Sequence, residues 1–194
     1  MIMQITREKR NVAVLAASQA LFMTGATMLV ILSGLVGLDL AEDKALATLP
    51  VSAVMIGNAL TMVPASLLMG KIGRRPGFIL GALIGAGGAA VAVAAILDRD
   101  FRLFVLGTFI IGIYAGFAQY YRFAAADAAS TGFKSKAISL VVAGGALAAL
   151  VGPALTKWSS GLLAPDGFLG SYLVVAGLAL AAAALLGLLD VPLP

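Results

Sequence analysis

Four polar side chains that could bind a ligand lie inside long apolar stretches of the chain. They are Gln19, Tyr114, Gln119 and Arg122. A polar group at membrane depth is costly unless water or a partner reaches it. Gln119 and Arg122 are three positions apart, so on a helix they share one face and can present an amide and a guanidinium to an anionic or carbonyl-bearing solute. We predict that the four residues line a solute site. The alternative for Arg122 is structural, with its head group extended to the membrane interface.

The elements that must position these side chains are apolar runs of the length that crosses a bilayer, roughly 20 residues. The chain has 194 residues, of which 61% are hydrophobic and 11% are charged. Its mean hydropathy is +1.06, which excludes an ordinary soluble protein. We predict an all-α membrane protein in which residues 1–194 form a single six-helix transmembrane bundle. The six runs span residues 11–36, 51–70, 77–97, 103–126, 137–157 and 168–189.

The residue types that the chain lacks narrow its chemistry. It contains no Cys, so it has no disulfide framework and no thiolate, and it contains no His, the commonest metal ligand. The apolar runs also carry no paired carboxylates of the kind that general acid–base catalysis uses. We therefore predict that the chain is not an enzyme and that it holds neither a metal nor a cofactor.

The net charge of +4 is explained by topology rather than by binding to nucleic acid. If the N-terminus is cytoplasmic, nine cations fall on the inner side and four on the outer side, as the positive-inside rule requires. We predict a multi-pass protein of the cell (inner) membrane with both termini cytoplasmic. The inner cations are Arg7, Lys9, Arg10, Lys71, Arg74, Arg75, Arg122, Lys134 and Lys136, and the outer ones are Lys44, Arg99, Arg102 and Lys157.

The order of the apolar runs repeats along the chain. The last three runs begin about 90 residues after the first three, with the polar segment Asp98–Arg102 between the two sets. Three helices per unit place the start of the second unit on the opposite side of the membrane. We therefore predict a 3+3 inverted repeat, with units at 11–97 and 103–189, of the kind found in transporters.

A short basic loop separates the second and third runs and contains Lys71, Gly73, Arg74 and Arg75. It resembles the loop between helices two and three of major facilitator superfamily transporters, whose pattern is Gly-x-x-x-Asp-Arg-x-Gly-Arg-Arg. Gly73, Arg74 and Arg75 match that pattern, whereas Ser66, Gly70 and Lys71 replace its first Gly, its Asp and its first Arg. The resemblance implies the N-terminal six-helix half of such a transporter.

Two further motifs support the resemblance and imply gating roles. In the family, an acid at the cytoplasmic end of helix four pairs with the Arg of the basic loop, so Asp127 would pair with Arg74 and latch the inner side of the bundle. Gly152 and Pro153 match the Gly-Pro of the pattern in the family's fifth helix. With the basic loop, these residues form the expected gating set.

The family usually has two six-helix bundles with the solute site between them. The resemblance therefore implies transport of a small solute by alternating access, in the lipid bilayer, with a second six-helix bundle as partner. That partner is a second copy in a homodimer or a separate half chain, unless the sequence is a fragment of a longer protein. The alternative function is a non-transporting membrane scaffold or assembly factor.

Overall fold

The structure is a computed structural model that describes residues 2–162 and 167–190. Within those residues every regular element is helical, and six helical spans are long and apolar enough to cross a membrane. The prediction of an all-α, six-helix membrane protein is therefore confirmed. The elements are α1 (Ile2–Leu40), the short 3-10 helix η1 (Lys44–Leu46), α2 (Leu49–Ile72), α3 (Arg74–Asp98), α4 (Phe101–Ala118), α5 (Tyr121–Asp127), α6 (Lys134–Ser159) and α7 (Gly167–Leu186).

Two of these helices differ from the predicted runs. Helix α1 begins at Ile2, so it includes residues 2–10, which precede the first predicted run. The fourth span is interrupted, because α4 ends at Ala118 and α5 begins at Tyr121. Gln119, the C-cap of α4, therefore lies in a break rather than within a continuous helix.

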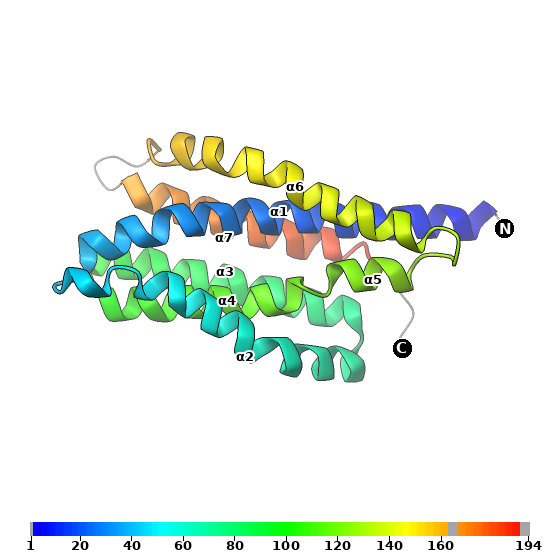
Figure 1. Cartoon of the computed structure of the whole chain (residues 1–194), viewed down its shortest axis with the longest axis horizontal. Helices are drawn as coiled ribbons and strands as arrows, with labels where there is room; N and C mark the ends of the chain where they lie inside the picture. The colour runs from blue at the N-terminus through cyan, green and yellow to red at the C-terminus, as the bar shows by residue number, and fades with distance from the viewer. Residues whose placement is uncertain (1, 163–166, 191–194) are drawn as a thin grey trace.

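Helices α1, α3, α4 and α7 lie between α2 and α6, which are at opposite edges of the bundle (Figure 1). Helix α1 packs along α6 and α7, α4 packs along α2 and α3, and α3 packs against α7. Exchanging α1 with α4, α2 with α6 and α3 with α7 therefore preserves the main contacts. This arrangement is consistent with the 3+3 inverted repeat.

Glycines allow the helix backbones to approach closely along these seams. A Cβ added to Gly88 of α3 would lie 2.8 Å from the backbone nitrogen of Ile111 in α4. A Cβ on Gly107 of α4 would lie 2.8 Å from the backbone nitrogen of Ala92. The many small residues of the third run therefore serve helix packing.

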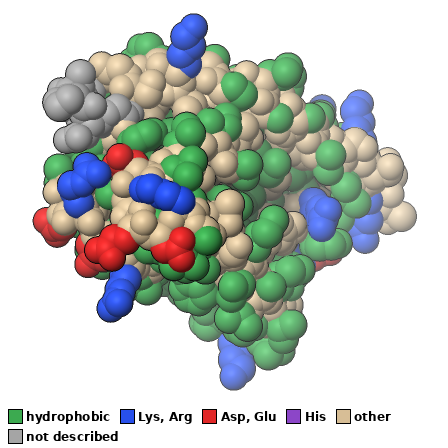
Figure 2. Space-filling view, turned by 60° about the vertical axis from the view of Figure 1, so that its left-hand side comes forward, with side chains coloured by type: hydrophobic (Ala, Val, Ile, Leu, Met, Phe, Trp, Pro, Cys, Tyr) green, Lys and Arg blue, Asp and Glu red, His purple; other side chains and the backbone are tan. Residues whose placement is uncertain are grey.

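The two ends of the described chain meet at one end of the bundle. The Asn11 side chain donates a hydrogen bond to the backbone oxygen of Asp190 at 2.7 Å, and the Asp190 N–H donates to the Asn11 amide oxygen at 3.0 Å. The Asp190 carboxylate also binds Arg7 and Arg10. Figure 2 shows acidic side chains gathered on the left, toward the end of the bundle that lies away from Asn11 and Asp190. On the right of the view most of the charged side chains are Lys and Arg.

Candidate functional site

A groove runs over the central helices α1 and α4, with α2 along one side and α6 along the other. It consists of two lobes that share Phe22, Met23 and Gln119. The lobe on the α6 side, called here the polar lobe, has a volume of about 420 Å³. The lobe on the α2 side, called here the apolar lobe, has a volume of about 460 Å³.

The polar lobe brings together three of the four predicted solute residues, namely Gln19, Gln119 and Arg122. The half-buried Gln19 side chain lies beside Gly145 of α6, and Gln119 is also half-buried. The exposed Arg122 places its guanidinium 5.1 Å from the centre of the Phe123 ring. The lobe therefore offers two amides and one cation to a ligand.

Two of those groups lie at or beside the break between α4 and α5, Gln119 in the break and Arg122 in α5. The Gln119 N–H still bonds the Ala115 oxygen at 3.2 Å, so the helical pattern continues to the cap and then stops. Arg122 belongs to the next helix, α5, and reaches the same lobe. The two side chains therefore share a cavity although no continuous helix joins them.

The apolar lobe contains a polar residue that sequence reasoning did not select, Asn58 of α2. Its amide oxygen is shielded from solvent and has no hydrogen-bond partner. Ser33 also lines this lobe, but its hydroxyl is hydrogen-bonded to the Tyr172 hydroxyl at 3.1 Å. The sequence signal for Asn58 was an amide within an apolar run, the same signal that identified Gln19.

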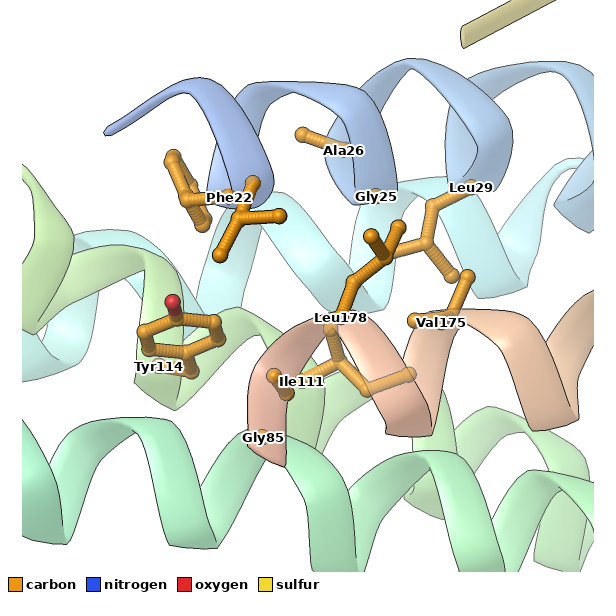
Figure 3. Close-up of a pocket in the computed structure, with 11 residues that line it drawn as sticks. Phe22, Gly25, Ala26, Leu29, Gly85, Ile111, Tyr114, Val175 and Leu178 are labelled. Carbon is orange, nitrogen blue, oxygen red and sulfur yellow. The ribbon is translucent and has the colours of Figure 1, made fainter. Parts of the chain in front are cut away.

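Tyr114, the fourth predicted solute residue, lies outside both lobes. It is buried, its hydroxyl accepts a hydrogen bond from the Tyr121 hydroxyl at 3.3 Å, and its ring packs edge-on against Phe22 at 5.2 Å. Figure 3 shows Tyr114 beside Phe22, with Ile111 and Leu178 nearby, around a cavity of about 20 Å³. That space is close to the minimum for one water molecule, so Tyr114 is placed for interior packing.

The basic loop forms the ion pair that the resemblance implied. Gly73 ends α2 and precedes α3 with a φ of 92°, a conformation that favours glycine. The next residue, Arg74, binds the carboxylate of Asp127, the last residue of α5. The Arg74 side chain is 24% exposed and that of Asp127 is 55% exposed, so the pair is partly solvated. Lys71 and Arg75 are exposed.

The Gly-Pro pair of the fifth span lies inside α6. Gly152 is buried against α1, where an added Cβ would lie 2.7 Å from the Cβ of Thr27. Pro153 is exposed, and α6 continues past it to Ser159. Gly152 therefore acts here as a close-packing residue between α1 and α6.

The charges and ligand types available near the groove are few. Arg122 is the charged residue among the side chains that line the two lobes. Among residues 2–162 and 167–190, no three His, Cys, Asp or Glu residues come together in a way that could hold a metal ion. The groove is therefore suited to hydrogen bonding and apolar contact.

Comparison with known proteins connects this geometry to a family. Residues 15–194 match the family model described as Major Facilitator Superfamily. The riboflavin transporter RfnT of Brucella anthropi is 43% identical over 187 residues, which cover 96% of this chain and 47% of that protein. The crystal structure of a variant of the E. coli fucose:proton symporter FucP matches with a TM-score of 0.71 and 21% identity, over 93% of this chain and 49% of that one. The chain thus spans about half the length of each.

Proposed function

Because the chain belongs to the Major Facilitator Superfamily, we propose that it forms one six-helix bundle of a transporter that moves a small solute by alternating access. The observation that carries this proposal is the groove in which Gln19, Gln119 and Arg122 meet. Polar groups at membrane depth are retained where they line a solute path or a wet cavity. Gln19, Gln119 and Arg122 are the solute contacts in this proposal.

The groove requires a second bundle. Side-chain amides left against hydrocarbon cost a few kcal/mol each, so the polar lobe must be covered in the membrane. Both ends of the described chain lie at the same end of the bundle, and two copies inserted in the same direction can therefore face each other. The partner that we propose is a second copy, with a separate half chain as the alternative.

The solute that we propose is riboflavin or a closely related planar heterocycle. Support comes from the 43% identity to a protein named as a riboflavin transporter. Support also comes from the groove itself, because a flat aromatic ring suits the apolar lobe and a hydroxylated chain suits the amides of the polar lobe. Arg122 adds a donor that can bind hydroxyl or carbonyl oxygens.

The proposed location is the cell inner membrane, with both termini in the cytoplasm. The nine-to-four distribution of cations supports this orientation. On that orientation the Arg74–Asp127 pair lies at the inner mouth of the bundle. We propose that it acts as a latch that stabilises one state of the alternating-access cycle, together with the glycine turn at Gly73 and the Gly152–Pro153 segment.

Equilibrium binding tests the proposed solute site. Titration of riboflavin, followed by its fluorescence, with the full chain in lipid nanodiscs should give saturable binding. Gln119→Ala and Arg122→Ala should each weaken it about tenfold by removing a hydrogen bond. Ser52→Ala serves as the control, because Ser52 is an exposed residue of α2 that lines neither lobe. A folded chain that binds no riboflavin would contradict the proposed solute.

A further inference from the structure

We propose that Asn58 recognises the solute by pairing its carboxamide with the imide edge of a planar heterocycle held in the apolar lobe. This inference rests on the proposed function. It adds a specificity-determining residue on α2 and names the imide as the chemical group that this residue recognises.

The amide oxygen of Asn58 has an unmet hydrogen-bonding requirement. The oxygen is shielded from solvent and unpaired, although buried polar atoms almost always have a partner. An unpaired buried oxygen raises the free energy of the empty site, and a ligand that supplies a donor removes that cost. A solute with an N–H group can therefore supply the hydrogen bond that the Asn58 oxygen lacks.

The surroundings of Asn58 leave it as the polar recognition group of the apolar lobe. Ser33 is already engaged by Tyr172, and Gln119 lies where the two lobes join. The remaining lining side chains are apolar, with Phe22 and Met55 among them. In such a setting a single amide discriminates strongly, because a solute that cannot pair with it leaves polar groups unsatisfied.

A carboxamide matches an imide edge because each carries a donor beside an acceptor. Because the oxygen is shielded in this structure, the proposed pairing requires the Asn58 amide to rotate about its Cβ–Cγ bond, which brings the oxygen to the lobe. There the oxygen accepts from the imide N–H while the amide nitrogen donates to a neighbouring carbonyl. In the oxidised ring of riboflavin the imide N–H is the one N–H donor. The hydroxylated chain then extends into the polar lobe, toward Gln19 and Arg122.

A methyl group on the imide nitrogen provides the test, because it removes the donor and keeps the ring. Riboflavin and 3-methylriboflavin are titrated against the full chain in nanodiscs. The unmodified chain should bind riboflavin about tenfold more tightly than the methylated compound. Asn58→Leu and Asn58→Ala should both bind the two compounds equally, at about the affinity of the unmodified chain for 3-methylriboflavin. Thermal unfolding verifies that each variant is folded, and Ser52→Ala should keep the tenfold preference.

The outcomes separate this inference from the proposed function. In one outcome the unmodified chain binds riboflavin and the Asn58 variants still prefer it to 3-methylriboflavin. Another group then binds the imide N–H, and the inference is overturned. Equal binding of both compounds by the unmodified chain overturns it too. If the unmodified chain binds neither compound, the riboflavin proposal itself fails and the inference fails with it.

Discussion

Arg74, the first residue of α3, and Asp127, the last residue of α5, form an ion pair that joins these two helices at one end of the bundle. The pair lies beside a small pocket of about 180 Å³ that Arg74 and Tyr120 help to line. The Tyr120 hydroxyl donates a hydrogen bond to the backbone oxygen of Met62 at 2.8 Å, which ties the α4–α5 break to α2. The α4–α5 segment is therefore linked both to α3, through Asp127, and to α2, through Tyr120.

Removing either partner of the Arg74–Asp127 pair should have the same effect as removing both. Because Asp127 is more than half exposed, solvent screening limits the expected coupling free energy to about 0.5–1 kcal/mol. The measurement is a double-mutant cycle with Arg74→Gln and Asp127→Asn, read by thermal unfolding in mild detergent. Strictly additive effects of the two substitutions would show that the pair contributes nothing.

Two adjacent glycines of α3 should respond differently to the same substitution. In Gly88→Ala the new Cβ would lie 2.8 Å from the Ile111 backbone nitrogen, so α3 and α4 must separate, at a cost of about 1–3 kcal/mol. Gly87→Ala is the matched control, since no atom lies within 4 Å of its added Cβ and alanine favours the helix. Thermal unfolding should give a lower midpoint for Gly88→Ala only. Equal midpoints would contradict the close approach of α3 and α4.

The buried contact between Asn11 and Asp190 should matter more to stability than the exposed ion pair beside it. Asn11 is 4% exposed and exchanges two hydrogen bonds with the Asp190 backbone, so Asn11→Ala should cost about 1–3 kcal/mol. Arg7→Ala breaks an ion pair whose side chains are 63% and 41% exposed, and should cost less than about 1 kcal/mol. The midpoints of thermal unfolding compare the two variants. A larger effect of Arg7→Ala would show that electrostatic attraction dominates at this end.

The hydroxyl of Tyr114 should affect packing rather than solute binding. Tyr114→Phe removes the acceptor of the Tyr121 hydroxyl and should lower stability by about 1 kcal/mol, with riboflavin affinity changed less than twofold. Gln19→Ala is the contrasting variant, because it should weaken binding and leave the unfolding midpoint nearly unchanged. A tenfold loss of affinity in Tyr114→Phe would instead place Tyr114 in the solute site.

The features that could be predicted from the sequence are those set by composition and local motif. Six apolar runs of bilayer length specify six helices. The pairing of Arg74 with Asp127 followed from the basic loop, because the resemblance joined two positions 53 residues apart in the sequence. Gln19, Gln119 and Arg122, which the structure brings together in the polar lobe, were selected because large polar side chains are rare within the spans.

The rest depended on geometry that a polarity pattern does not record. Tyr114 and Gln119 are five positions apart, a rotation of about 140° on a helix, so the two side chains point to different faces. The break at Gln119 is not next to a Pro, so the sequence gives no signal for it. The start of α1 at Ile2 was also not predicted, and contacts near it, such as that of Glu8 with Ser130, appear only in the structure. Asn58 is an amide within an apolar run, as Gln19 is, but its unpaired oxygen and its place in the apolar lobe are visible only in the structure.

Uptake of labelled riboflavin into proteoliposomes that contain the purified chain tests the central claim most directly. In separate preparations that are not used for uptake, single cysteines at position 19 or 119 can be introduced without removing any native thiol, and crosslinking between copies tests whether two bundles face each other. We predict saturable uptake by the paired chain, strongly reduced in Gln119→Ala and unchanged in Ser52→Ala. Paired bundles that take up no more riboflavin than protein-free vesicles would contradict the account.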